Sequence, residues 1–391
     1  MHVSHLSLSN VRSFRRLEAD LRPGMHVVTG PNGSGKSNLL EAIALLATTR
    51  SARTGNDADL IAWAALRDEA LPVARLSAQV EAAEGPVTVE IVVGGRAGGA
   101  GEAPAATRRF RVNGVARRAS DLIGRLRVVH FSADDLGIIE GAPAARRRYL
   151  DVTISQLDPV YVRALQRYQR VLQQRNSLLR RLQERRGAAS ELDFWDQELA
   201  QSGAVVLTAR SHTLAALARG AAARYHELAP DAEETLSVCY RPALPAPLSD
   251  AIDGPAEELA PRLLATLEEL RARDIQAGVT RIGPHRDDVT FLIGGHPAGA
   301  TASRGQQRSA ALALRLAEVA LSTQRTGDPP VLLLDDVLSE LDAVRRERVI
   351  ATAYEVDQVL ITTPDPDRPG RDELPAARRY RVAGGVLEPM D

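Results

Sequence analysis

The chain has 391 residues, of which 44% are hydrophobic and 25% charged, a composition typical of a folded globular protein rather than a disordered or fibrous one. The net charge of −1 does not indicate nucleic-acid binding, so any basic surface must be local. The single cysteine, Cys239, excludes an internal disulfide and a paired-cysteine metal site. No apolar run reaches the roughly 18 residues of a membrane span and no signal-peptide core is visible, so we expect a cytoplasmic protein with no membrane association.

The first elements are a predicted strand and a short basic segment. Val3, Leu6 and Leu8 stand among polar neighbours, which favours a strand over residues 1–9. The segment 10–16 that follows is either a solvated turn or a site from which Arg12 reaches a nucleotide phosphate.

Residues 30–37 fit the pattern G-x-x-x-x-G-K-[ST], a loop whose backbone N–H groups hold nucleotide phosphates. An apolar run precedes the loop at 25–29, and a helical pattern follows from 38 to about 47, which is the context such a loop needs because a helix N-terminus favours anions. Lys36 is the only lysine of the chain, and it occupies the position where a compact ammonium fits and a planar guanidinium does not. The predicted nucleotide-binding residues are Gly30, Pro31, Asn32, Gly33, Ser34, Gly35, Lys36 and Ser37.

The middle of the chain changes from strands to helices. Between about 72 and 115 a period of two, broken by glycine-rich stretches that include 98–106, predicts an antiparallel sheet with a basic last hairpin. Asp158 and Pro159 are a favourable N-cap and first helical residue for a helix ending near Gly187, and a second helix is expected from Leu192 to about Ala229. We predict that the two form an antiparallel helical arm. Residues 242–247 and 254–255 resemble linkers, and 257–273 is again helical.

The last third contains the second half of the predicted site. Four apolar residues, 331–334, lead into Asp335, as in a buried parallel strand that delivers a carboxylate at its C-terminal end. Asp335 and the Ser37 hydroxyl are therefore predicted to hold Mg²⁺, and Asp336 to orient or deprotonate the attacking water. About 30 residues earlier, Ser303 and Gly305 open a strong helix, which forms an anion-binding surface.

This order of motifs resembles ABC-type ATPases. The segment 303–307, which includes Gln306, looks like their signature motif, whose serine and glycine cap the γ-phosphate held by the other subunit. The segment 339–342, ending in Asp342, looks like their D-loop. The fold class predicted is therefore α/β: an ABC-type ATPase head, built as a mixed α/β lobe with an antiparallel β arm, plus a helical arm domain. We place the N-terminal part of the ATPase lobe at 1–150, the helical arm at 151–275 and the C-terminal ATPase part at 276–391.

The sequence is similar to the RecF family along nearly the whole chain. The similarity is carried by the runs 283–288, 303–308 and 333–342, together with 10–14 and 146–151. This resemblance implies a bacterial DNA-repair ATPase that dimerises on ATP, binds double-stranded and gapped DNA, and acts with RecR and RecO to load recombinase on single strands. By the same resemblance, Lys36 would hold the β- and γ-phosphates, Ser37 and Asp335 the Mg²⁺, and Asp336 the water. Ser303 and Gly305 would complete the partner subunit's site.

Two positions depart from the ABC pattern, and three other functions compete with the favoured one. The strand end at 362–365 has no switch histidine, and the predicted inter-lobe loop at 130–135 has no glutamine. The alternatives are a transporter's nucleotide-binding subunit, a long-coil chromosome-maintenance head and a scaffold that does not hydrolyse ATP. The long spacing between the motifs argues against a transporter subunit, and the short middle region argues against a long-coil head. The scaffold is disfavoured because Lys36, Asp335 and Ser303 are all intact. Because Asp336 is shorter than glutamate, we expect slow hydrolysis that acts as a release timer.

Overall fold

The computed structural model describes residues 1–51, 53–96, 105–229, 234–365 and 374–390. The chain forms two compact units, of which unit 1 comprises Met1–Asp135 and Leu312–Asp391 and unit 2 comprises Leu136–Ala311. The chain thus leaves unit 1 after Asp135 and returns within one long helix, α11 (Arg304–Thr326). The division expected from the sequence has its boundaries at 150 and 275 instead. Most of the glycine-rich stretch 98–106 lies outside the described residues.

A mixed six-stranded sheet in unit 1 carries the nucleotide-binding motifs. Its order is β15-β14-β3-β13-β12-β8, with β14, β3, β13, β12 and β8 parallel and β15 antiparallel at the edge. Strand β12 is buried except at its last residue because it has a parallel neighbour on each side, as predicted from its unbroken apolar run. The strands are β3 (Gly24–Thr29), β8 (Val128–Phe131), β12 (Val331–Asp335), β13 (Gln358–Thr363), β14 (Arg378–Ala383) and β15 (Val386–Met390).

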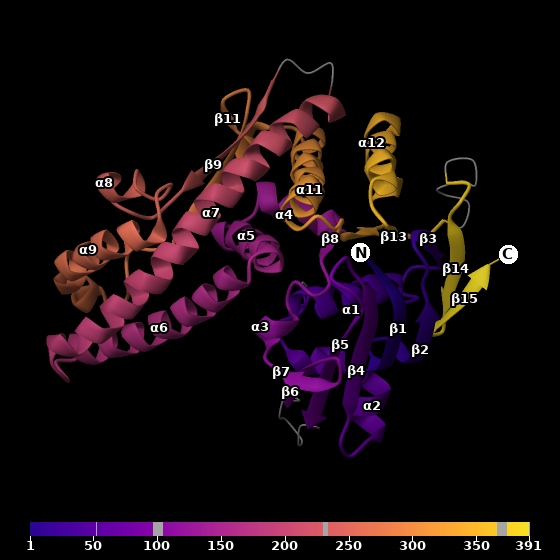
Figure 1. Ribbon diagram of the computed structural model, residues 1–391, viewed down its shortest axis with the longest axis horizontal. Helices are drawn as coiled ribbons and strands as arrows, with labels where there is room; N and C mark the ends of the chain where they lie inside the picture. The colour runs from indigo at the N-terminus through magenta and orange to yellow at the C-terminus, as the bar shows by residue number, and fades with distance from the viewer. Residues whose placement is uncertain (52, 97–104, 230–233, 366–373, 391) are drawn as a thin grey trace. The chain divides into compact units, whose positions relative to one another are not determined.

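The predicted antiparallel sheet is present and is larger than expected. Its order is β2-β1-β4-β5-β6-β7, so the N-terminal hairpin extends the strands predicted between 72 and 115. Helix α1 (Lys36–Thr48) packs between the two six-stranded sheets, and its Leu39 and Leu40 belong to one core with residues of both (Figure 1). The strands are β1 (His2–Val11), β2 (Phe14–Asp20), β4 (Val73–Glu81), β5 (Val87–Arg96), β6 (Ala105–Val112) and β7 (Val115–Arg117). The remaining helices of this unit are α2 (Trp63–Asp68), α3 (Ala119–Leu122) and α12 (Ala343–Tyr354).

Unit 2 is built on the two long helices predicted from the sequence. Helix α6 (Pro159–Gln183) starts as predicted, with the Asp158 carboxylate accepting from the N–H groups of Val160 and Tyr161, and it ends four residues before Gly187. Helix α7 (Leu192–Leu228) packs against both α6 and α9 (Ala256–Ala277). A small sheet, ordered β11-β10-β9, completes the unit. Its other elements are α4 (Leu136–Ile139), α5 (Pro143–Leu157), β9 (Leu236–Arg241), α8 (Ala246–Ser249), β10 (Asp288–Ile293), β11 (His296–Pro297) and α10 (Ala298–Thr301).

Three local expectations need correction. Segment 10–16 is not a solvated turn: β1 and β2 continue through most of it, and only Arg12 and Ser13 form the hairpin turn. Residues 242–247 are not a simple linker, because α8 begins at Ala246 and buries Leu248. His130 and Phe131 lie on β8 rather than in a loop. In the described part of the chain, no helix combines the length and apolar character that crossing a membrane requires.

Two buried arginines hold the helices of unit 2 together. Arg175 is fully buried and donates to Asp196 (2.6 Å) and Asp274 (2.8 Å), which are also fully buried. Arg210 bonds to Asp151 (2.7 Å) and Asp287 (3.3 Å). Burial raises the pKa of both Asp274 and Asp287, while the neighbouring guanidinium opposes the shift. Each carboxylate therefore depends on its arginine to remain charged inside the unit.

We expect Arg175→Ala to destabilise the protein by about 3–5 kcal/mol, because it leaves Asp274 buried without its cation. Urea denaturation followed by circular dichroism measures the loss. Arg170→Ala, an exposed position on the same helix, is the matched control and should change the unfolding free energy by less than about 0.5 kcal/mol. Equal urea midpoints for Arg175→Ala and the wild type would contradict the role given to this buried pair.

Candidate nucleotide site

The phosphate loop joins β3 to α1, as the sequence pattern predicts. Gly35 is the N-cap of α1 and has a φ of 109°, a left-handed conformation that favours glycine. A Cβ atom at this position would lie 2.4 Å from Ser13 Oγ of the β1–β2 turn. The first N–H groups of α1 have no partner within the helix, so the loop and helix start form an anion-binding surface.

Lys36 lies over the loop from the first turn of α1. Its Nζ donates to Gly30 O (2.7 Å) and Pro31 O (3.1 Å), and the residue is only 7% exposed. Burial lowers the pKa of Lys36, whereas the charges of Asp336 and Asp335 oppose the shift. The ammonium is therefore in the loop, beside the two carboxylates that end β12.

Asp335 brings three distant segments together. Its Oδ1 accepts from Ser37 Oγ (2.9 Å), 298 residues away in the sequence, and from Thr362 Oγ1 (2.7 Å) on the neighbouring strand β13. A carboxylate and a hydroxyl are oxygen ligands of the kind Mg²⁺ prefers. Ser34 Oγ of the phosphate loop and His130 Nε2 are among six side-chain atoms of unit 1 that are buried without a hydrogen-bond partner among the described residues. This donor set fits Mg²⁺ held through Ser37 and Asp335, with nucleotide phosphate beside it.

Asp336 has an unusual backbone conformation directly after the strand. Its φ is 55°, a left-handed value that aspartate tolerates better than most residues. Its N–H donates to Thr362 O (3.2 Å) and Oγ1 (3.1 Å), and its Oδ1 accepts from Ser339 Oγ (2.8 Å). For the residue that we predicted to act on water, β13 thus holds the backbone and Ser339 of the predicted D-loop holds the carboxylate.

The predicted D-loop residue Asp342 is the N-cap of α12. Its Oδ1 accepts from Arg345 N (3.0 Å), and its carboxylate is also paired with the Arg345 guanidinium. The hydrogen bond from the Arg345 N–H lowers the pKa of Asp342 below its usual value, with the guanidinium charge adding to the effect. Asp342 therefore fixes the direction in which α12 leaves the loop.

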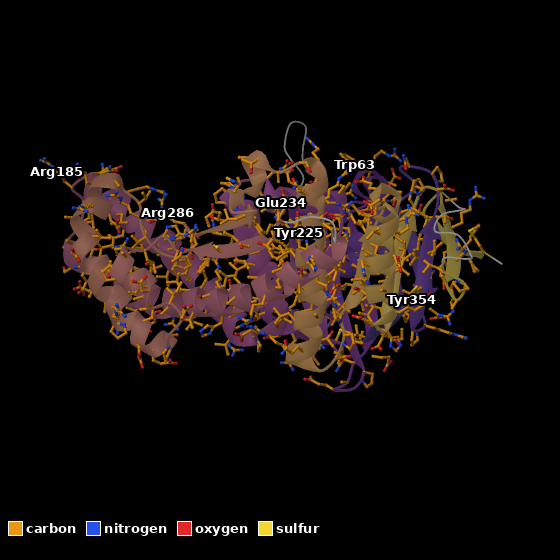
Figure 2. The ribbon with its side chains drawn as sticks, turned by 90° about the horizontal axis from the view of Figure 1, so that it is seen from above. Trp63, Arg185, Tyr225, Glu234, Arg286 and Tyr354 are labelled. Atoms are coloured by element: carbon orange, nitrogen blue, oxygen red, sulfur yellow. The ribbon has the colours of Figure 1, made fainter. Side chains whose placement is uncertain are left out.

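The predicted signature residues lie at the start of α11. Ser303 and Gly305 are exposed, and Ser303 and Gln306 form a reciprocal cap: Ser303 N donates to Gln306 Oε1 (2.8 Å) and Gln306 N to Ser303 Oγ (3.2 Å). The amide of Gln306 also donates to Glu234 (3.1 Å), which is labelled in Figure 2. These residues belong to unit 2, and the phosphate loop belongs to unit 1.

Arg12 is paired within the protein. Its guanidinium donates to both oxygens of Glu41 on α1 (2.9 and 3.2 Å) and to Asp59 O (2.8 Å). Arg12 is therefore tied to the helix that starts at the phosphate loop, and a direct phosphate contact by Arg12 remains a prediction. Glu41 is buried. Its position among the apolar residues of α1 is the sequence signal that could have pointed to a buried ion pair.

Thr362 and His130 had no role in the site predicted from the sequence. Thr362 lies where the missing switch histidine was sought, and it bonds to Asp335. His130 follows Val128 and Val129 on β8, so the apolar pattern was visible but too short to place the strand. Burial lowers the pKa of His130, an effect that Asp135 opposes and Arg315 reinforces.

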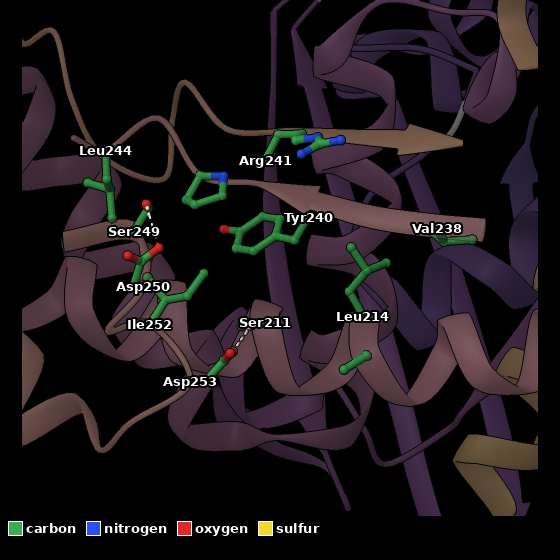
Figure 3. A pocket seen from close by; sticks show the side chains of 12 residues that line it. Ser211, Leu214, Val238, Tyr240, Arg241, Leu244, Ser249, Asp250, Ile252 and Asp253 are labelled. Atoms are coloured by element: carbon green, nitrogen blue, oxygen red, sulfur yellow. Dashed lines mark hydrogen bonds between the residues drawn. The ribbon is translucent and has the colours of Figure 1, made fainter. Parts of the chain in front are cut away.

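A cavity of about 570 Å³ lies in unit 2, between α7, β9 and the segment 242–253 (Figure 3). Leu214, Val238 and Ile252 give it apolar walls, and Asp253 accepts a hydrogen bond from Ser211 at its edge. None of its lining residues was predicted to bind nucleotide. The nucleotide site is therefore defined by the loop and strand ends of unit 1, not by this cavity.

Comparisons with known proteins agree with this geometry. The family description "RecF/RecN/SMC N terminal domain" matches residues 2–368. A crystal structure of an Smc head bound to the C-winged helix domain of ScpA has a TM-score of 0.52 at 16% identity, covers all of this chain and 97% of that one, and shares the fold. The fold and the site define an ABC-type ATPase head, with its antiparallel β arm and helical arm, as predicted.

Closer relatives specify the family. The chain is 45% identical to the DNA replication and repair protein RecF of Chloroflexus aurantiacus over 99% of both chains, and 46% identical to that of Roseiflexus castenholzii over 100% of both. A solved structure of the recombination mediator protein RecF with ATP, in the RecFOR pathway, has a TM-score of 0.84 at 29% identity and covers 100% of this chain and 98% of that one. The chain belongs to the RecF family.

We expect Gly35→Ala to weaken ATP binding at least about tenfold, because the added Cβ collides with Ser13 and displaces the loop. Titration with a fluorescent ATP analogue measures the affinity. Gly85→Ala is the matched control: its φ is 108°, but no atom lies within 4 Å of the added Cβ. This control carries the same backbone strain without the collision, so it should bind ATP like the wild type. Equal ATP affinity for both variants would show that the close approach of Ser13 is unimportant.

Proposed function

We propose that this chain is an ATP-dependent DNA-binding protein of recombinational repair and replication-fork maintenance. Two copies close around two ATP molecules on double-stranded or gapped DNA and help to load recombinase on single strands. Slow, DNA-stimulated ATP hydrolysis then releases the protein. The names of the RecF relatives and the solved RecF structure with ATP support this proposal.

The observation that carries the proposal is the hydrogen bond between Ser37 and Asp335, because it joins the phosphate loop to the carboxylate at the end of β12. In the ATP-bound state Lys36 binds the β- and γ-phosphates, and Ser37 and Asp335 hold Mg²⁺, which neutralises phosphate charge. The free N–H groups at the start of α1 bind phosphate oxygens.

The second half of each site comes from the other copy. Ser303 and Gly305 are exposed at the start of a 23-residue helix, where N–H groups and the helix dipole favour an anion. Each copy thus supplies a phosphate loop to one site and a signature helix to the other. ATP shifts the equilibrium toward the dimer because only the closed dimer makes both sets of contacts.

Asp336 orients the attacking water and accepts its proton. The bonds from its N–H to Thr362 fix its backbone, the bond from Ser339 Oγ restricts its carboxylate, and the shorter side chain of aspartate limits its reach toward the γ-phosphate. Hydrolysis is therefore slow compared with DNA binding. The protein remains an ATPase whose turnover sets the lifetime of the complex.

DNA binding rests on local arginine surfaces that contact phosphates with little sequence reading. In the basic hairpin of β6 and β7, Arg109, Arg117 and Arg118 are exposed, whereas Arg108 is paired with Asp57 and unavailable. RecR and RecO are the protein partners implied by the family.

The decisive experiment measures DNA binding without nucleotide, with ATP and with ADP, together with the oligomeric state. Tight binding to double-stranded or gapped DNA should require ATP and coincide with dimerisation. DNA affinity that is equal in all three states, or dimers that form without ATP, would overturn the proposal.

Lys36→Arg should abolish ATP-driven dimerisation, because the larger planar guanidinium cannot replace an ammonium that lies 2.7 Å from Gly30 O. Size-exclusion chromatography with light scattering, with and without ATP, measures the change. The thermal unfolding midpoint should remain close to that of the wild type. A Lys36→Arg protein that still shifts to the dimer would refute the composite site.

Ser303→Arg should bind ATP normally and fail to dimerise, because it blocks the exposed start of α11 without touching the phosphate loop. Ser303→Ala should show a milder form of the same defect. Mixing Ser303→Arg with Lys36→Arg provides the sharper test, since the mixed dimer has one intact site and each homodimer has none. Recovery of part of the ATP-driven dimer is expected on mixing; no recovery would indicate that both residues act within one copy.

A further inference from the structure

His130 lies on the face of the mixed sheet that carries the nucleotide site. It pairs in register with Leu333 of the parallel strand β12, and Asp335 follows two residues later. Because side chains alternate along a strand, His130, Leu333 and Asp335 point to the same face. Leu333 packs in one core with Leu39 and Leu40, so this face is the one covered by α1, whose first turn holds Lys36 and Ser37.

The Nε2 atom of His130 is buried and has no hydrogen-bond partner among the described residues. Leaving such an atom unpaired is unfavourable, so buried polar groups of this kind usually have a partner in the working state of a protein. The charged groups whose fields act on the pKa of the ring are Asp135, Arg315, Asp335 and Asp134. In the part of the chain that the structure describes, no donor or acceptor satisfies Nε2, although the charge of Asp335 of the nucleotide site acts on the ring.

Asp135 and Arg315 form an ion pair where the chain leaves unit 1 and returns to it. Arg315 donates to Asp135 Oδ1 through Nη2 (2.7 Å) and Nε (3.2 Å), and Asp135 Oδ2 accepts from Ser132 N (3.0 Å). Asp135 is the last residue before the chain leaves unit 1, and Arg315 follows closely on its return at Leu312. The pair therefore ties together, within unit 1, the two segments through which the chain passes to unit 2.

We propose that His130 is the positioning residue that reads the nucleotide state of this ATPase, through a hydrogen bond between its Nε2 and a water molecule held at the Ser37–Asp335 site. The inference rests on the proposed function, because it requires ATP and Mg²⁺ to bind there. The ring lies beside both Asp335 and the Asp135–Arg315 pair, so a change at the nucleotide site reaches both chain crossings through one side chain. This role requires only a hydrogen-bonding group at position 130.

The test compares three variants by equilibrium titration with a fluorescent ATP analogue, once with Mg²⁺ and once with EDTA. His130→Leu removes the hydrogen bond and should weaken binding about three- to tenfold in Mg²⁺, with little change in EDTA. His130→Gln keeps a hydrogen-bonding amide and should bind within about twofold of the wild type. The matched control is His26→Leu, which removes a buried histidine of the same sheet whose Nε2 bonds to Arg22 O (2.7 Å) and whose Nδ1 has no partner among the described residues. This control should lower stability and leave ATP affinity unchanged.

A second measurement does not depend on any variant folding well. In the wild-type protein labelled with ¹⁵N-histidine, the Nε2 resonance of His130, assigned by its absence in His130→Gln, should shift on adding ATP with Mg²⁺. An unchanged resonance, or equal affinities of His130→Leu and the wild type in Mg²⁺, would overturn the inference alone. If the wild type binds ATP neither with Mg²⁺ nor with EDTA, the proposed function itself is wrong, whereas equal binding in both conditions contradicts only the Ser37–Asp335 metal site.

Discussion

The hydrogen bonds that meet at Asp335 Oδ1 connect the phosphate loop to the mixed sheet. Ser37 reaches this oxygen from the first turn of α1, and Thr362 reaches it from the end of β13. Both bonds are possible because β12 and β13 are parallel and buried, so their carboxyl ends meet at one edge. Asp336 then turns sharply away, held by the same threonine, and leads into the predicted D-loop and α12. The candidate site thus depends on β12 and β13 being neighbouring parallel strands as much as on the phosphate loop.

Local patterns were enough to predict the parts of the site that are continuous in sequence. The phosphate loop, the apolar run before Asp335 and the capped start of α6 each depend on neighbours a few residues away, so the sequence pattern identified them. The partners of these residues are separated by tens to hundreds of positions. Neither the Arg12–Glu41 pair nor the bond from Thr362 to Asp335 has a periodic signal, because each depends on how separate elements pack.

The same reason explains what was missed in the fold. Strand β8 has four residues, too few for a reliable period, and it becomes a strand by pairing with β12. Strand β2 was hidden in an arginine-rich stretch in which Phe14, Leu17 and Ala19 are buried against the core, a pattern whose alternation is broken between Phe14 and Leu17. The buried arginines of unit 2 also gave no sign, since an arginine on a helix is normally solvated. Their carboxylate partners come from three helices and from Asp287, directly before β10, and only the tertiary structure brings them together.

The single lysine has a practical consequence for chemistry on this protein. With 49 basic residues and only one lysine, an amine-directed reagent finds one side-chain target in the entire chain, and that target lies in the phosphate loop. Lys36 is only 7% exposed and its Nζ is bonded to Gly30 O and Pro31 O, so acylation of Lys36 would report how often the loop exposes the amine. Bound nucleotide would shield the amine, and the yield of one modified peptide would report occupancy directly. Amine coupling to a surface or dye would be divided between this loop and the α-amine of Met1, which is paired with Asp328 and Asp357, whereas the arginine side chains would be untouched.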